Sequence, residues 1–367
     1  MIDLQVSVPG GDYPVRIEAG LLTQAGGLVE EVHDGHRGLV VMDENVREAH
    51  GDTLLSSFGS SWQLARHDLV ATEHNKRIET VASIYESSLR AGLDRGSLVI
   101  GCGGGITGDV AGFAAASFLR GIDLVLVPTT LLAMVDASVG GKTGVNLLLP
   151  DGRGVGKNLA GAFWQPRAVL VDPLVLSTLP TRDVRCGLAE CIKHGIISDP
   201  GLLEMIAADR ESILAVDPDT ITALVERAVK VKVSVVQQDE REAGGRASLN
   251  LGHTFAHAIE PLDMLDLRHG EAVAIGLVAA ATCSHRLGRV DGSMVEQTRN
   301  LLEAVGLPTR LSHPVPIADL VAAMRFDKKT RDGQIRLVLP GPRGVEIVDD
   351  VPEADVHAAW LAVGAAD

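Results

Sequence analysis

The chain has 367 residues, of which 46% are hydrophobic and 22% are charged, so it is globular and long enough for two domains. Its formal net charge of −15 argues against a nucleic-acid or anionic membrane partner, and 3% aromatic residues are too few for base-stacking platforms. The four cysteines form no C-x-x-C motif, no signal peptide is visible, and the longest apolar run is too short to cross a bilayer. We therefore expect a cytoplasmic protein.

The first half of the chain has the pattern of a parallel α/β domain. A hairpin is predicted over residues 4–17, and apolar runs predict buried strands at 38–42, 97–100, 124–127 and 168–171. Asp43 and Asn45 directly follow the first of these runs. Because ligands in open α/β sheets bind at the carboxyl ends of strands, both are candidates for cofactor contact. An Asx turn leading into the next helix is the alternative, equally supported by the sequence.

A glycine-rich turn, G-C-G-G-G-I-T-G-D at residues 101–109, joins the strand at 97–100 to a helix. Glycines let the backbone approach a phosphate, and the free N–H groups and dipole of the helix attract its charge. Gly103, Gly105 and Gly108 match G-x-G-x-x-G, but Asp123 precedes the next strand instead of ending it. We expect a dinucleotide loop that differs from the standard Rossmann one, with a glycine turn for close packing alone as the alternative.

Hydroxyl and cationic side chains follow the strand at 124–127. Thr129 and Thr130 close it, and Lys142 follows two glycines in D-A-S-V-G-G-K-T-G-V-N at 136–146. A lysine in this position suits a fixed cation that faces a phosphate or a reacting hydroxyl. Asp136 stands where a P-loop requires glycine, so ATP chemistry is disfavoured. A loop is predicted at 150–154.

After about residue 180 the pattern becomes helical, with helices predicted over 183–198, 220–240 and 271–287 and a terminal hairpin over 335–348. Arg246, Asn250, His253 and His257 have the spacing that places all four on one face of a single helix. The two histidines could bind a metal, and His269 follows on the next loop. The alternative is one buried, hydrogen-bonded histidine and one solvated histidine.

These segments together resemble the 3-dehydroquinate synthase family of the sugar-phosphate cyclase superfamily. The matching stretches cover nearly the whole chain in one order: D-E-N at 43, G-G-G-I-T-G-D at 103, F-L-R-G-I at 118, P-T-T-L-L-A-M-V-D-A-S-V-G-G-K-T-G-V-N at 128, G-K-N-L-A-G-A-F-W-Q-P at 156, G-L-A-E-C-I-K-H-G at 187, L-N-L-G-H-T-F-A-H-A-I-E at 249, R-H-G-E-A-V-A-I-G at 268 and D-K-K-T-R-D-G at 327.

The resemblance implies an α/β fold with a Rossmann-like, parallel-sheet NAD-binding domain over 1–179 and a mainly helical metal- and substrate-binding domain over 180–367. It implies a homodimeric lyase that converts an anionic sugar phosphate, 3-deoxy-D-arabino-heptulosonate 7-phosphate, to 3-dehydroquinate and phosphate. The expected steps are transient oxidation by NAD, phosphate elimination, reduction and aldol cyclisation. This reaction belongs to the shikimate pathway of aromatic amino acid biosynthesis.

The resemblance also assigns residues. A divalent metal, usually zinc with cobalt as the alternative, would be held by Glu190, His253 and His269, a ligand set that suits a catalytic zinc. NAD would contact Asp43, Asn45, Glu73, Lys76, Gly104, Gly105, Ile106, Thr107, Gly108, Asp109, Thr129, Thr130, Lys142, Lys157 and Thr178. Substrate binding and catalysis would fall to Lys142, Asn158, Lys193, Lys232, Arg246, Asn250, His257 and one of Lys328 and Lys329, with Arg120 reaching in from a second subunit.

Two departures from the family pattern stand out. The stretch between Asn146 and Lys157 is longer than usual for the family, and Ala256 replaces a glycine.

Three other functions remain open. The nearest is another sugar-phosphate cyclase such as amino-dehydroquinate synthase. A metal- and NAD-dependent polyol dehydrogenase would leave the phosphate-binding set Lys142, Asn158 and Arg120 unexplained. A non-catalytic binding module would leave all the aligned polar groups without a role.

Overall fold

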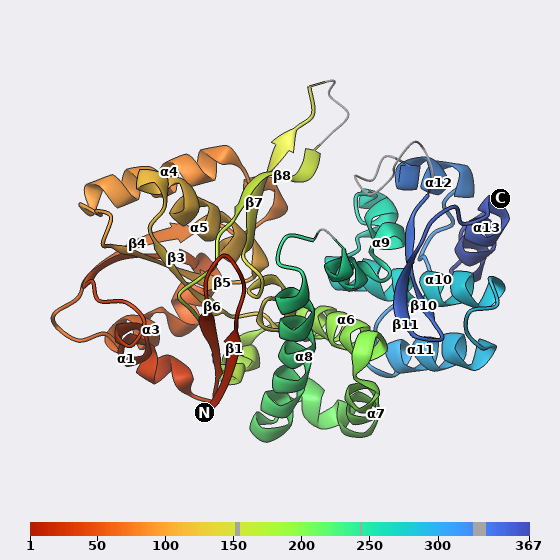
Figure 1. The fold of residues 1–367 in the computed structure, drawn as a ribbon, viewed down its shortest axis with the longest axis horizontal. Coiled ribbons are helices and arrows are strands. Elements are labelled where there is room, and N and C mark those ends of the chain that lie inside the picture. Colours follow the sequence, from red (N-terminus) through yellow and green to blue (C-terminus); the bar gives the residue numbers. More distant parts are fainter. Residues whose placement is uncertain (151–154, 243, 326–334) are drawn as a thin grey trace. The chain divides into compact units, whose positions relative to one another are not determined.

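The computed structural model describes residues 1–150, 155–242, 244–325 and 335–367 (Figure 1). The chain forms two compact units, the first comprising Met1–Pro180 and Val216–Arg241 and the second Thr181–Ala215 and Glu242–Asp367. The predicted domain boundary, between residues 179 and 180, lies one residue from the point where the chain passes from the first unit to the second. Residues 216–241, which were predicted to belong to the second domain, pack with the first unit instead. Compact units need not be functional domains, so that boundary stays a prediction.

A seven-stranded sheet forms the core of the first unit, in the order β1-β2-β9-β6-β5-β3-β4. β1 (Ile2–Val6) and β2 (Tyr13–Ile17) form an antiparallel hairpin, and all other neighbours are parallel. The parallel strands are β3 (Arg37–Asp43), β4 (Gln63–Leu69), β5 (Leu98–Gly103), β6 (Asp123–Pro128) and β9 (Ala168–Val171). The predicted parallel sheet is confirmed, and its central strands are buried, as their continuous apolar sequences require.

Helices and short helical turns connect these strands or follow the last of them in the chain. The helices are α1 (Ala25–Glu30), α2 (Glu44–Val46), α3 (Asp52–Ser56), α4 (Ile78–Arg90), α5 (Gly105–Ser117) and α8 (Pro218–Gln238). The turns are η1 (Leu21–Gln24), η2 (Arg47–Gly51), η3 (Glu73–Asn75), η4 (Phe118–Arg120), η5 (Ala133–Ala137) and η6 (Pro173–Thr178). α5 starts directly after β5, as the glycine-rich turn predicts, and small residues let it pack closely on that strand.

The sequence pattern did not predict a second, two-stranded sheet in the first unit. β7 (Lys142–Leu148) and β8 (Val155–Phe163) pair antiparallel and extend from the unit as an arm (Figure 1). A register shift between Val145 and Leu147 and several glycines break the alternation by which a strand is recognised. Part of the loop predicted at 150–154 lies outside the described residues.

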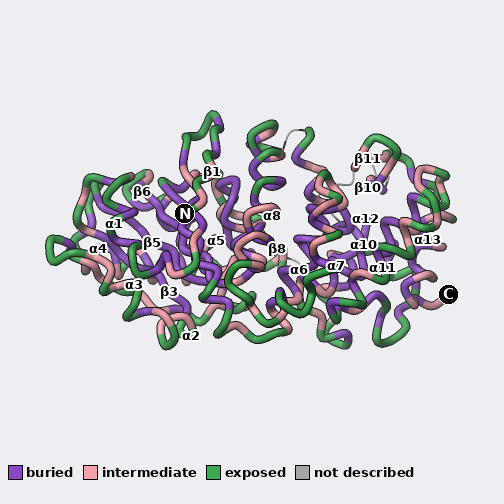
Figure 2. The backbone as a smooth tube through the Cα atoms, turned by 90° about the horizontal axis from the view of Figure 1, so that it is seen from below, coloured by how far each residue is buried: buried purple, intermediate pink, exposed green. Residues whose placement is uncertain are grey.

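The second unit is built around α10 (His269–Arg286), whose alanine-rich middle is buried (Figure 2). Four helices pack against α10: α6 (Thr181–Ser198), α9 (His253–Ile259), α11 (Gly292–Ala304) and α13 (Glu353–Ala362). The unit also contains α7 (Pro200–Leu214), η7 (Gly245–Asn250), η8 (Asp263–Leu265), α12 (Ile317–Arg325) and the hairpin of β10 (Leu337–Gly341) and β11 (Gly344–Val348). The predicted fold class, a Rossmann-like parallel sheet plus a helical part, is confirmed. Among the described residues, no helix is both long and apolar enough to cross a membrane.

The single helix predicted from Arg246 to His257 is wrong. η7 ends at Asn250, Gly252 adopts a left-handed conformation with φ 77°, and α9 starts at His253. A Cβ on Gly252 would lie 2.9 Å from the backbone nitrogen of Leu277 on α10. The close approach of α9 to α10 therefore breaks the helix, and Arg246 and Asn250 lie on a different element from the two histidines.

Replacing Gly252 with alanine is expected to lower the free energy of unfolding by about 1–3 kcal/mol, because alanine is strained at this φ and its Cβ meets α10. Urea unfolding measures the loss. Gly245→Ala is the matched control, since a Cβ there meets nothing within 4 Å and the backbone is not left-handed. Equal stability of the Gly252 variant and the unaltered chain would contradict the prediction.

Candidate metal centre and cofactor site

Three side chains from three helices of the second unit converge at one point. Glu190 lies on α6, and His253 and His269 are the first residues of α9 and α10. Their ligand atoms lie within 4.8 Å of one another, with Glu190 Oε1 3.6 Å from His253 Nε2 and 3.4 Å from His269 Nε2. Ligands at about 2.0–2.2 Å from a zinc ion in tetrahedral geometry stand at similar separations, so the three groups fit one divalent metal.

The carboxylate of Glu190 is fully buried, which is costly unless a cation accompanies it. Lys193, one turn further along α6, forms an ion pair with it and is also fully buried. This pair provides one positive partner for Glu190 within the chain itself. The ring of His269, 3.4 Å from Glu190 Oε1, provides a second when it is protonated, and a bound metal would take the place of that proton.

The two histidines have different ionisation. Burial, only partly opposed by the charge of Glu190, lowers the pKa of His253 well below its ordinary value. Burial also disfavours the charged form of His269, but hydrogen bonds to Glu190 and Glu260 outweigh it and raise the pKa of His269 to about 10. At neutral pH His253 offers a neutral nitrogen to a metal, whereas His269 must release a proton to bind one.

Neighbouring groups orient both rings. The carbonyl of Leu251 lies 3.1 Å from His253 Nδ1, so the proton on that nitrogen leaves Nε2 for a metal. Glu260 lies 3.4 Å from His269 Nδ1, on the far side of the ring from Glu190. The sequence analysis missed Glu260, although it ends the quoted motif H-T-F-A-H-A-I-E. The rings of His257 and His253 are nearly perpendicular, with their centroids 5.7 Å apart.

The remaining predicted residues of the second unit lie on other segments. Arg246 is buried on η7, and the side-chain amide of Asn250 donates to Glu242 Oε1 at 2.6 Å. Lys328 and Lys329 lie outside the described residues. A recess of about 660 Å³ is lined by Arg182, Asp266, Glu271, Glu303, Arg310 and their neighbours; among the described residues that line it, none is a candidate metal ligand.

In the first unit, the glycine turn presents the start of α5 as predicted. Gly104 precedes the helix, and a Cβ on Gly103 would lie 2.5 Å from Thr107 Oγ1, so the turn requires glycine for packing whether or not a phosphate binds. Lys76 forms an ion pair with Asp109 on the first turns of α5. Burial raises the pKa of Asp109, and the charge of Lys76 opposes that rise.

Asp43 and Asn45 stand at the carboxyl end of β3. The Asp43 carboxylate accepts hydrogen bonds from the backbone and the side-chain nitrogens of Asn45, at 2.8 and 3.0 Å. The Asx turn that the sequence left open is therefore present. A role of these residues in cofactor contact stays a prediction.

Asn146, which the sequence analysis did not select, joins three residues that it did. The side chain of Asn146 donates to Glu73 Oε2 at 2.8 Å and accepts from the backbone N–H of Asn158 at 2.9 Å, and its own N–H donates to the carbonyl of Lys76 at 2.8 Å. Asn158 is held with φ 52°. The sequence offered one indication that Asn146 belongs with these residues, its place at the end of the motif D-A-S-V-G-G-K-T-G-V-N.

Other predicted residues of the first unit form separate contacts. Lys232 on α8 forms an ion pair with Asp136. The sequence analysis used Asp136 only to exclude a P-loop. Thr178 Oγ1 lies 2.8 Å from His50 Nε2. Leu119 and Arg120 both have positive φ, 51° and 72°.

The fold and the three converging side chains define a class: an α/β chain with a glycine turn at the start of α5 and a candidate metal centre of two histidines and one carboxylate. Two family models match this chain, the 3-dehydroquinate synthase N-terminal family over residues 67–186 and the 3-dehydroquinate synthase C-terminal family over residues 187–330. The chain belongs to the 3-dehydroquinate synthase family.

A relative of high coverage supports this assignment, and two solved structures are similar to the chain in fold. The 3-dehydroquinate synthase of Synechocystis sp. is 40% identical over 362 residues, covering 98% of this chain and 99% of the relative. A solved 2-epi-5-epi-valiolone synthase from Streptomyces hygroscopicus, with NAD⁺ and Zn²⁺ bound, is 28% identical with a TM-score of 0.85, covering 97% of this chain and 98% of that one. A 2-deoxy-scyllo-inosose synthase shares the fold, with a TM-score of 0.87, 24% identity and coverage of 98% and 100%.

Proposed function

We propose that this chain converts 3-deoxy-D-arabino-heptulosonate 7-phosphate to 3-dehydroquinate and phosphate, as a lyase that uses NAD and a divalent metal. The observation that carries the proposal is the convergence of Glu190, His253 and His269 in a chain of this family. When bound, the metal supplies Lewis acidity toward a substrate hydroxyl, and NAD supplies reversible acceptance of a hydride, so that no net oxidation results.

Zinc is the proposed metal, with cobalt as the alternative. Two imidazoles and one carboxylate leave coordination positions open, as a catalytic zinc requires. The zinc in the related valiolone synthase supports the same choice. The NAD bound to that relative supports NAD as the cofactor. The glycine turn before α5 is the proposed cradle for its pyrophosphate, because a helix start after a glycine turn offers free N–H groups to an anion.

The residues of the chain bind and orient an anionic substrate in this proposal. Lys142, Asn158, Asn250 and His257 bind the phosphate by charge-assisted hydrogen bonds. Lys193, Lys232 and Arg246 bind the carboxylate and hydroxyls, so that cationic side chains meet an anionic substrate although the formal charge of the chain is −15. Phosphate leaves by elimination, with one of its own oxygens placed to accept the proton.

We further propose a cytoplasmic homodimer. All four cysteines are buried and unbonded to one another, which suits a reducing compartment. Arg120 follows Leu119, an apolar side chain that is 39% exposed, in a turn of positive φ. Such a turn suits a segment that presents Arg120 to a second copy of the chain.

The deciding experiment supplies the heptulosonate phosphate with NAD and zinc, and follows phosphate release and NADH absorbance together. We expect phosphate and dehydroquinate with no lasting NADH. Release only from the amino analogue or from sedoheptulose 7-phosphate would favour another cyclase. Steady accumulation of NADH would refute the lyase assignment and favour a polyol dehydrogenase.

A further inference from the structure

His269 is the least enclosed of the three candidate ligands. Its side chain is 34% exposed, against 10% for His253 and 0% for Glu190. It is the first residue of α10, and Arg268 occupies the capping position before it. Side chains favoured at that position accept a hydrogen bond from the first turn, which a guanidinium cannot do. Other contacts must therefore hold the first turn of α10 in place.

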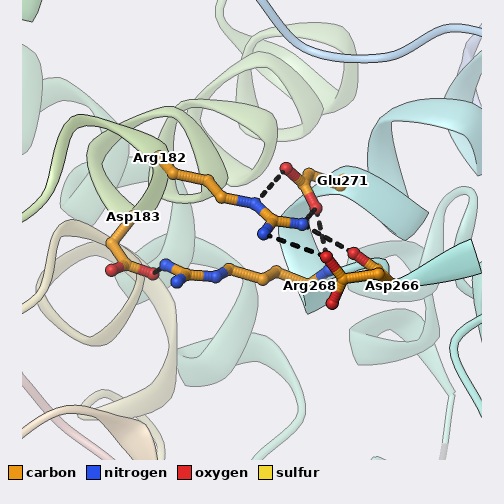
Figure 3. A network of polar contacts seen from close by, with 5 residues as sticks. All are labelled: Arg182, Asp183, Asp266, Arg268 and Glu271. Carbon is orange, nitrogen blue, oxygen red and sulfur yellow. Dashed lines mark hydrogen bonds and ion pairs between the residues drawn. The ribbon is translucent and has the colours of Figure 1, made fainter. Parts of the chain in front are cut away.

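Glu271 and Arg182 provide those contacts (Figure 3). Glu271 Oε2 accepts from the backbone N–H of Arg268 at 2.8 Å. Arg182, on the first turn of α6, donates to both oxygens of Glu271 at 2.8 Å, and to the carbonyl of Asp266 at 2.6 Å. The Arg268 side chain in turn forms an ion pair with Asp183. Arg268 before His269 and Glu271 after it are thus both bound to residues of α6, the helix that carries Glu190.

The backbones of α6 and α10 approach closely beside His269. A Cβ on Gly270 would lie 2.2 Å from the carbonyl oxygen of Cys186, so this approach sets the separation of the helices there. The paired hydrogen bonds between Arg182 and Glu271 add a contact that also fixes the orientation of the first turn of α10, because a planar guanidinium fixes direction as well as distance.

We infer that Arg182 is a positioning residue for the metal centre, holding His269 at the distance from Glu190 that a metal requires. The inference rests on the proposed metal centre. Arg182 is neither one of the three candidate ligands nor one of the residues proposed to bind substrate, and acts through Glu271 and the backbone of Arg268.

The test is the zinc affinity of Arg182→Met, measured by competition with a chromophoric chelator. The affinity is expected to fall by about 10- to 100-fold, the usual effect of removing a group that orients a ligand. The visible absorption of the cobalt-substituted variant is expected to change as well, because it reports the geometry around the ion. Arg182→Lys keeps the charge but not the paired hydrogen bonds, so its zinc affinity should lie between those of the unaltered chain and of Arg182→Met.

Arg286→Met is the matched control, since Arg286 pairs with Asp355 at 2.9 Å near the other end of the same helix. An unchanged zinc affinity in Arg182→Met, or an equal fall in Arg286→Met, would overturn the inference. If Arg182→Met does not fold, Glu271→Gln answers the same question, with weaker zinc binding expected and unchanged binding contradicting it. Zinc binding by the unaltered chain distinguishes failure of the metal centre from failure of the role of Arg182. If the unaltered chain binds no zinc, the proposed metal centre itself is overturned.

Discussion

Replacing Lys193 with methionine is expected to lower the free energy of unfolding of the metal-free protein by about 3–5 kcal/mol. Lys193 and Glu190 are both fully buried, and methionine would leave the carboxylate without its ammonium partner. Saturating zinc is expected to restore much of the loss, because a bound cation takes over part of the compensation and binds only the folded state.

Urea unfolding with and without a chelator measures both effects. Trp360 is fully buried beside Phe255 in the second unit, so its fluorescence reports on the helices that carry the centre. Replacing Trp62 and Trp164 with phenylalanine isolates that signal. Arg325→Met is the control, since Arg325 forms an exposed ion pair with Glu353 in the same unit as Trp360 and its loss should cost less than about 1 kcal/mol. A similar small loss for both variants would show that the buried pair contributes little.

Replacing His253 with alanine is expected to lower the rate of phosphate release about a thousandfold. Lewis-acid stabilisation by a bound metal contributes several kcal/mol to a transition state, and each 1.4 kcal/mol corresponds to about a factor of ten. His253 is suited to bind the metal through Nε2, because burial favours its neutral ring and the carbonyl of Leu251 fixes its tautomer. The expected cause is loss of the metal, so the zinc content of the purified variant should fall in parallel.

His285→Ala provides the comparison, because this exposed histidine lies on α10 and its Nδ1 is 3.0 Å from the carbonyl of Val290, away from the three ligands. Its rate and zinc content should match those of the unaltered chain. A His253 variant that keeps both its zinc and its activity would show that the ligand set is wrong.

The sequence by itself determined the buried strands of the parallel sheet, the glycine turn before α5 and the family. These depend on local features: continuous apolar runs mark buried strands, and the turn between β5 and α5 carries its own glycines. The three candidate ligands could also be named, because their motifs lie in the order that the family shares.

Only the tertiary structure decided how those residues are held. The break at Gly252 follows from the approach of α9 to α10, which involves residues distant in the sequence. The contacts of Asn146 with Glu73 and Asn158 depend on a hairpin whose alternation is interrupted. Arg182 and Glu271 are 89 positions apart. No periodicity brings them together, because their meeting depends on the packing of two helices and not on the local pattern of either.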